Sequence, residues 1–239
     1  TLGQATVTNL NWPEVGSIRL QPSILPTGSE TIGDYLGAGD VTRYTAPNIG
    51  RFIPDRFDTV VTQGCSSFTY SGQPLPTTVT AKATGGTVTA NYGGATWARL
   101  VTLFDANGGT GTWSGNTISA ASFANGLGSA NAATYTFANP ATAPTTIKVR
   151  AKEPTGADGV DSSTGSEGTS NILSGRLRLL NANGSNILDL PMAMRAEYWQ
   201  SAANGWQTNS SDTCTVATLA FAAVGTFDTS KTCAWDTGN

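Results

Sequence analysis

The stretch 174–214 constrains the fold of this chain most strongly, because apolar and polar residues alternate along it. Leu177 and Leu179 alternate with Arg176 and Arg178, and the pattern returns further along the stretch. A period of two residues places one face of a strand on a core and the other in water. The stretch therefore predicts short antiparallel strands. Four are expected: Arg176–Leu180, Ile187–Leu190, Met192–Trp199 and Trp206–Thr208.

Two Asn-Gly pairs punctuate this stretch, at Asn183-Gly184 and Asn204-Gly205. Both residue types adopt a positive φ at low cost, and the pair typically closes two-residue hairpins. We therefore expect a β-meander, with the apolar face of its strands turned to a core.

The composition extends the all-β prediction to the whole chain. Charged residues make up only 12% of the 239 residues, about half the usual fraction of ~25%. Thr, Val and Gly are too frequent, and Glu, Lys, Leu and Gln too sparse, for a long amphipathic helix. Turn signals recur every 8–12 residues or so, which is typical of sandwiches and barrels.

The region 57–152 carries the pattern of an Ig-like β-sandwich, which has about seven short strands in about 100 residues. In its last expected strand, Ile147 and Val149 face inward and Lys148, Arg150 and Lys152 face water. The seven expected strands are Phe57–Thr62, Ser67–Tyr70, Thr77–Ala83, Arg99–Phe104, Thr117–Ser122, Ala133–Phe137 and Thr145–Lys152.

The sequence thus predicts an Ig-like sandwich followed by a second antiparallel unit, without substantial helix. Residues 1–56 are expected to pair with one or both units, with strands at Thr6–Leu10 and Gly16–Leu20. A Gly/Ser/Asp-rich linker or loop is expected at 153–170, and the meander unit at 171–239.

Charge and hydropathy exclude two classes of partner. A net charge of −3 and scattered Lys and Arg residues leave no basic stripe for nucleic acid. No apolar run reaches the roughly 18–20 residues that span a bilayer. No leader is visible, so we expect any signal peptide to have been removed or to lie upstream. The start in mid-pattern at Thr1 suggests a fragment or a processed product.

Three cysteines fit no metal-binding spacing. Cys214 and Cys233 could pair, closing a loop of about 20 residues that would contribute roughly 3 kcal/mol. Alternatively, Cys65 pairs with one of them across the two units. The sequence leaves these choices open, and we expect an oxidising compartment.

The chain contains no histidine, which removes Ser-His-Asp and Cys-His catalysis and the usual general base near neutral pH. No lysine lies in an S-x-x-K motif. Glu197, next to aromatic residues, could serve a glycosidase, but we interpret it as the solvent-facing partner of Arg195 or Arg99. We expect a protein that is not an enzyme, with no catalytic residues and no cofactor.

Two sets of residues remain candidates for contact. The acidic loop offers hard oxygen ligands that suit Ca²⁺, although polar linkers of this kind usually bind nothing. Its candidate ligands are Glu153, Asp158, Asp161 and Glu167. Most of the six tryptophans are expected in the core. Those near loops or in the meander are possible contact residues: Trp97, Trp113 and Trp199, together with Tyr198.

Five ordered motifs resemble the domain of unknown function in the MSHA (mannose-sensitive haemagglutinin) type IV pilus biogenesis protein MshQ and related large bacterial surface proteins. The motifs are Glu14–Leu20, Asp34–Gly39, Gly50–Phe57, Cys65 with Phe68–Pro74, and Ser174–Cys214. They cover most of the chain, and residues 85–145 depart most from the family. The resemblance implies an exported protein of Gram-negative bacteria, on the cell surface or the pilus, with no catalytic residues to transfer.

The expected function is therefore that of a non-enzymatic extracellular adhesin or pilus-associated structural module, with other pilus or surface subunits as partners. One alternative is a filament subunit that binds its own copies by β-strand addition at Thr1–Leu20. Another is a carbohydrate-binding module with glycans as ligands, which requires a groove with an exposed tryptophan.

Overall fold

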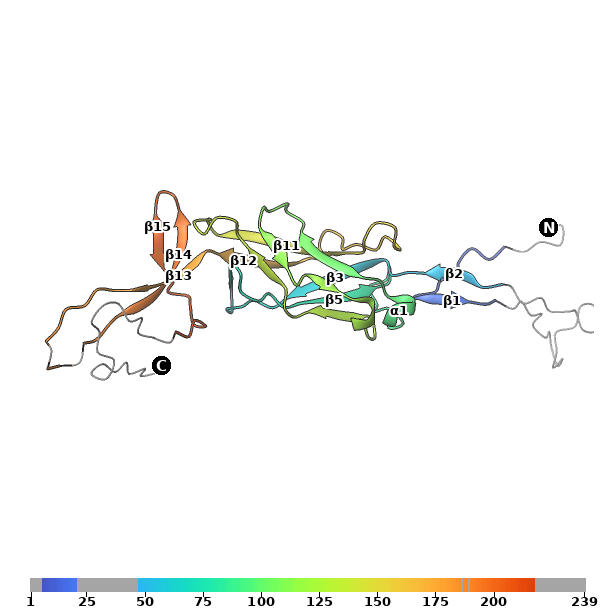
Figure 1. Ribbon diagram of the computed structural model, residues 1–239. Helices are drawn as coiled ribbons and strands as arrows, with labels where there is room; N and C mark the ends of the chain where they lie inside the picture. Colours follow the sequence, from blue (N-terminus) through green and yellow to red (C-terminus); the bar gives the residue numbers. More distant parts are fainter. Residues whose placement is uncertain (1–5, 21–46, 186, 189, 218–239) are drawn as a thin grey trace, which may run out of the picture.

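A computed structural model describes residues 6–20, 47–185, 187–188 and 190–217, and strands dominate this part (Figure 1). Within these residues, helix is limited to α1 (Gly94–Trp97) and the 3₁₀ turn η1 (Ala120–Ser122). No helix in the described ranges is long and apolar enough to cross a membrane. The all-β prediction is confirmed.

The strands are β1 Gly16–Ile18, β2 Ile49–Phe52, β3 Arg56–Val61, β4 Thr69–Tyr70, β5 Thr77–Lys82, β6 Val101–Asp105, β7 Thr112–Ser114, β8 Thr117–Ile118, β9 Leu127–Ala130, β10 Thr134–Thr136, β11 Thr145–Lys152, β12 Gly168–Leu173, β13 Gly175–Leu179, β14 Met194–Ser201 and β15 Gly205–Thr208.

Two sheets pack face to face in a sandwich. One has the strand order β4-β12-β11-β6-β8 and the other β3-β5-β9. The two sheets bury Phe57, Val79, Leu103, Ile147 and Ile172 completely in one shared core. Full burial of such a side chain stabilises the fold by about 1.5–3 kcal/mol, so this core is the main source of stability of the sandwich.

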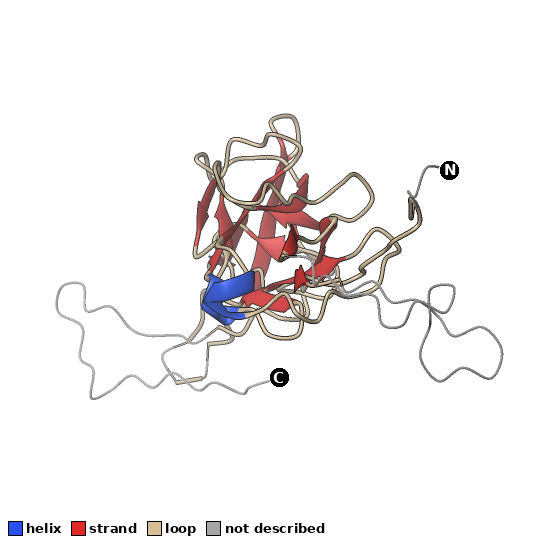
Figure 2. Ribbon diagram, turned by 90° about the vertical axis from the view of Figure 1, so that its right-hand side faces the viewer, coloured by secondary structure: helices blue, strands red, loops and turns tan. Residues whose placement is uncertain are grey.

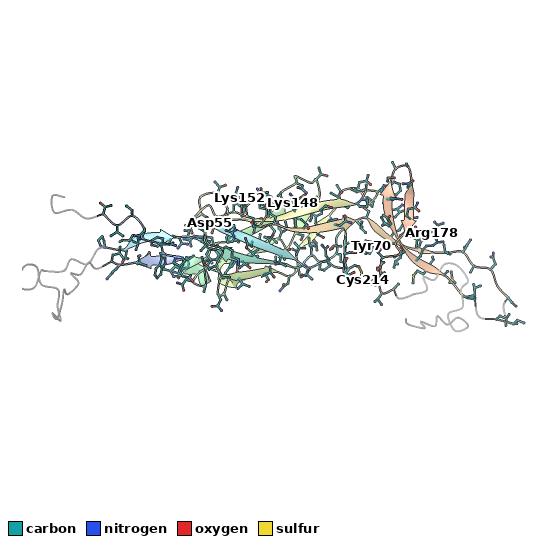
Figure 3. The ribbon with its side chains drawn as sticks, turned by 180° about the vertical axis from the view of Figure 1, so that it is seen from behind. Asp55, Tyr70, Lys148, Lys152, Arg178 and Cys214 are labelled. Carbon is teal, nitrogen blue, oxygen red and sulfur yellow. A yellow bond between two sulfur atoms is a disulfide. The ribbon has the colours of Figure 1, made fainter. Side chains whose placement is uncertain are left out.

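Strand β11 shows the predicted alternation residue by residue. Ile147 and Val149 are buried, whereas Lys148, Arg150 and Lys152 lie on the outer face. Figure 3 shows Lys148 and Lys152 side by side on that face. The pleat of the strand, which turns successive side chains to opposite faces, accounts for this pattern.

Of the region 153–170, predicted as a linker or loop, residues 153–167 form a loop and residues 168–170 begin the sandwich strand β12. Strand β12 pairs antiparallel with β11 and parallel with β4. The loop before it runs along β3, where the Phe57 amide donates to the Asp161 carbonyl at 3.2 Å and the Thr59 amide to the Ser166 carbonyl at 2.8 Å. Asp161 and Ser166 thus supply backbone acceptors to the edge strand β3, which composition alone does not reveal.

The described N-terminal residues form a ribbon of their own. We predicted that this segment would pair with one or both β units. In the described residues, β1 instead pairs antiparallel with β2 and extends neither sheet of the sandwich. Residues 6–10 are exposed and form no strand. Val15 is buried in the sandwich core and fastens the base of the ribbon.

Strands β13, β14 and β15 form a separate three-stranded antiparallel sheet, the terminal sheet. Asn204-Gly205 closes the β14–β15 hairpin as predicted, with a φ of +65° at Gly205. The prediction for Asn183-Gly184 is wrong, because β13 pairs directly with the eight-residue β14. The longer strand offers five successive cross-strand pairs, which a strand at 187–190 could not match.

The three parts follow one another along an elongated molecule. The β1–β2 ribbon lies at one end, the sandwich in the middle and the terminal sheet at the other end (Figure 1). Figure 2 looks along this axis and shows α1 at the side of the strand layers.

Candidate functional site

A disulfide bond joins the sandwich to the terminal sheet. It links Cys65, just before β4, to Cys214, after β15, with Cα atoms 5.5 Å apart. Of the pairings that the sequence left open, the structure thus contains the long-range one, across 149 residues. Cys233 lies outside the described residues. Spacing favoured no pairing because the fold, rather than the spacing, brings Cys65 beside the end of β15.

Hydrogen bonds surround this disulfide and complete the junction. The Tyr70 hydroxyl donates to Asp212 Oδ2 at 2.8 Å and accepts from Asn209 Nδ2 at 2.8 Å. Burial first, and then the bond to Asp212, raise the pKa of Tyr70 to about 12. Tyr70 also packs so closely on Gly175 that a Cβ at Gly175 would collide with its ring. The junction therefore fixes the start of β13 as well as the end of β15.

Asp212 fixes the chain next to Cys214. Its carboxylate accepts from the amides of Cys214 and Thr215 at 3.0 and 2.9 Å. Burial would raise the pKa of Asp212, but the hydrogen bonds from Thr215, Tyr70 and these amides outweigh it and lower that pKa. Cys65, Asp212 and Cys214 are close enough to resemble a metal site. The disulfide, however, leaves no thiolate to act as a ligand.

Glu197 lies at the centre of a charged cluster on one face of the terminal sheet. Arg176, its direct cross-strand partner, binds one carboxylate oxygen through Nε and a terminal nitrogen at 2.9 and 2.7 Å. Arg178 and Arg195 approach the other oxygen at 3.6 and 3.9 Å. The Arg176 guanidinium also stacks over the Trp206 ring at 4.3 Å. Three cations around one anion leave this face positively charged.

This geometry corrects the interpretation of Glu197 as a solvent-facing side chain. Its side chain is only 3% exposed, and its main partner is Arg176 rather than Arg195 or Arg99. The Arg176 hydrogen bond, followed by the charges of the three arginines, lowers the pKa of Glu197. A glycosidase acid needs a raised pKa, so this environment does not suit Glu197 to that role.

The four acidic candidates for a calcium site are not brought together. Arg51 binds Asp158 through Nε and a terminal nitrogen at 2.8 and 2.6 Å, which fastens β2 to the 153–167 loop. Glu153 is buried and accepts from the Tyr92 hydroxyl at 2.9 Å. The other two have their own cations: Asp161 faces Lys152, and Glu167 pairs with Arg150. Each carboxylate therefore binds a neighbouring side chain and helps to hold the loop in place. This arrangement gives no support to a shared Ca²⁺ site.

The four predicted contact residues are half-buried, and their side chains pack against neighbouring residues. Trp97 and Trp113 pack against the sandwich core, and Arg51 stacks over Trp97 at 5.4 Å. Tyr198 packs against the small cluster around Cys65, while Trp199 meets Trp206 edge to face at 5.6 Å. Their described surroundings thus favour packing over an open contact surface.

Sequence reasoning missed the residues that complete the junction and the charged cluster. Tyr70 and Asp212 lie 142 residues apart, and no pattern links them. Arg176 could have been matched to Glu197 from the strand pattern alone, given the correct β13–β14 register, but the expected hairpin at Asn183-Gly184 concealed that register. Figure 3 shows Tyr70, Arg178 and Cys214 at the same end of the molecule.

Comparison with known proteins places the chain in a family. The model of the third domain of DUF6701 matches residues 14–176, and that of the fourth domain matches residues 173–238. Neither curated proteins nor solved structures yield a match. The shared boundary, 173–176, coincides with the step from β12 to β13. The chain therefore belongs to the DUF6701 family of domains of unknown function and spans its third and fourth domains.

Proposed function

We propose that this chain is a non-enzymatic structural segment of an extracellular bacterial surface protein, which holds neighbouring modules in line as a spacer. The observation that carries the proposal is the Cys65–Cys214 disulfide between successive domains of an elongated molecule. A covalent link at a domain boundary restricts hinge motion there, as a load-bearing stalk requires.

The same bond supports the proposed extracellular location. Structural disulfides persist in oxidising environments such as the cell surface and the periplasm. The resemblance to MshQ supports a more specific placement, in the protein set of an MSHA-type pilus of a Gram-negative bacterium, with other pilus or surface subunits as partners.

The lack of histidine and the state of the buried carboxylates support a role without catalysis. Glu153 and Glu197, the two buried glutamates described, are both engaged by neighbouring donors. In each case the carboxylate holds neighbouring elements together, which suits a structural role better than that of an acid or base. The strand-addition alternative has less support, because β1 is only three residues long and already pairs with β2.

Replacement of residues 14–238 in the parent protein tests the spacer role. We expect an unrelated disulfide-linked pair of β domains of similar length to restore surface display and piliation, whereas deletion of the segment does not. Protease shaving and immuno-electron microscopy of the bacteria measure both. Failure of every unrelated spacer, with the parent protein still exported, would show that the segment has a more specific task.

A further inference from the structure

A groove of about 630 Å³ lies where the β1–β2 ribbon meets the sandwich. Its walls are the segment 11–14, the β2–β3 connection 53–55 and the turn 83–89 after β5. Figure 3 shows Asp55 at this position, at the opposite end of the sandwich from Tyr70 and Cys214. Small-molecule sites in proteins typically measure about 300–1,000 Å³, so the groove has room for a ligand.

Hydrogen bonds hold the walls in place without a ligand. The two carboxylate oxygens of Glu14 accept from the amides of Ala90 and Asn91, both at 3.0 Å. The next residue, Val15, is buried in the core. On the opposite wall the Asp55 amide donates to the Lys82 carbonyl at 2.8 Å. The groove is therefore preformed, as most small-molecule sites are.

The lining combines an aromatic surface with hydrogen-bonding groups. Trp12 and Ile53 are 40% and 42% exposed and provide apolar surface. The exposed hydroxyls of Thr84 and Thr87 and the carboxylate of Asp55 provide polar contacts. An indole ring with a polar rim matches a pyranose ring, which has an apolar C–H face and a circumference of hydroxyl groups.

Thr89 supplies an independent indication that something polar binds here. It lines the groove, its residue is 1% exposed, and its Oγ1 has no hydrogen-bond partner among the residues that the structure describes. A buried hydroxyl without a partner costs about 1–3 kcal/mol, and native proteins rarely tolerate one. A ligand hydroxyl in the groove would satisfy it once the Thr89 side chain turns its hydroxyl towards the groove.

We propose that this groove binds a neutral saccharide of one or two rings, which stacks on Trp12 and bonds to Asp55 and Thr89. Arg56, at 3.1 Å from Asp55, already balances that carboxylate, which removes the reason to bind a cation. The site differs from the tryptophans that the sequence suggested, because Trp12 is more exposed than the half-buried Trp97, Trp113 and Trp199.

Saturation-transfer NMR on the whole chain tests this site, with chitobiose, lactose and maltose as probes at millimolar concentration. We expect transfer to the ring protons of at least one probe. Trp12→Ala should weaken that binding at least about tenfold, because the indole is the largest apolar contact in the groove. Trp206→Phe, at the far end of the molecule, is the matched control and should bind as the wild type does.

Thr89→Val separates binding from folding. Because the Thr89 hydroxyl has no hydrogen-bond partner within the described ranges, its loss should leave the thermal unfolding temperature unchanged or raise it, while the affinity for the sugar falls. Absence of transfer to all three probes would overturn the proposal. So would transfer that persists unchanged in Trp12→Ala.

Discussion

The sandwich and the terminal sheet share the same alternating sequence pattern but bury it to very different extents. In the sandwich, Leu103 and Ile147 are completely buried between two sheets. In the terminal sheet, Leu177, Leu179 and Met194 alternate as predicted but are 50%, 48% and 36% exposed. The pattern thus predicts which residues share a face, whereas burial depends on whether a second layer covers that face.

The two regions also use charge differently. In the sandwich, ion pairs such as Arg51–Asp158 lie outside the core and fasten loops and the ribbon to it. In the terminal sheet, the Arg176–Glu197 pair joins neighbouring strands at the centre of one face. We infer that the sandwich is stable through its own core, and that the terminal sheet relies on the junction and on cross-strand contacts.

Substitution in the core should have the largest effect. Leu103→Ala leaves a cavity between the two sheets and should lower the free energy of unfolding by about 2–5 kcal/mol. Leu177→Ala, at a half-exposed position, should lower it by less than about 1 kcal/mol. Urea denaturation followed by tryptophan fluorescence measures both. An equal loss for the two variants would mean that the apolar face of the terminal sheet is as well covered as the core.

Removal of one tyrosine hydroxyl from the sandwich core, and of another from the junction with the terminal sheet, should give the next largest difference in stability. Tyr92→Phe takes a donor from the buried Glu153 carboxylate and an acceptor from the Arg99 amide. It should cost about 1–3 kcal/mol, because the Glu153 carboxylate left behind is buried away from water. Tyr70→Phe, at the half-buried junction, should cost only about 0.5–1.5 kcal/mol. Thermal unfolding of the two variants tests the order, and a larger loss for Tyr70→Phe would reverse it.

Alkaline titration should identify the junction hydroxyl. The pKa of Tyr70 rises from 10.0 to about 12 in the folded chain. Because the folded value is the higher one, the stabilising contribution of Tyr70 is complete below pH 10 and is lost as the pH rises towards 12. Absorbance at the tyrosinate band should show a group with this midpoint, which Tyr70→Phe removes. A titration unaltered by the substitution would contradict the junction geometry.

Acidification should loosen the terminal sheet, and we expect this effect to be the smallest of those predicted for single residues. Because the pKa of Glu197 is lowered in the folded chain, its stabilising contribution is complete above its unfolded-state pKa and is lost as the pH falls through the lower folded-state pKa. The protection of the amides of residues 194–199, measured relative to their intrinsic exchange rates, should therefore fall in acid, and Glu197→Gln should abolish most of this pH dependence. Arg176→Gln should do the same. A pH dependence that survives both substitutions would assign it to another group.

Local pattern predicted the strands that alternate strongly. The bounds expected for β5 and β11 are within a residue of those observed. The strands β7, β9 and β12 were missed, because they are rich in Gly, Ser or Thr and become strands only by pairing with neighbours. The hairpin predicted at Asn183-Gly184 was wrong for a related reason. The local turn signal is outweighed by the pairing of β13 with the longer strand β14.

The functional contacts were less predictable than the strands. The Cys65–Cys214 bond and the Tyr70–Asp212 hydrogen bond join positions more than 140 residues apart, so they exist only once the domains are in place. The groove beside Trp12 is formed by three separate segments. Nothing in the sequence around Trp12 distinguishes it from a core tryptophan, and its exposure is a property of the fold.

Hydrogen exchange with and without a reductant tests most directly whether the disulfide supports the terminal sheet. The native chain is followed by mass spectrometry before and after reduction of Cys65–Cys214, with Cys65→Ser as a control that needs no reductant. We predict that peptides of β14 and β15 lose protection, while those of β3, β5 and β11 keep theirs. Loss of protection in both regions together, or in neither, would contradict this account of a self-sufficient sandwich and a dependent terminal sheet.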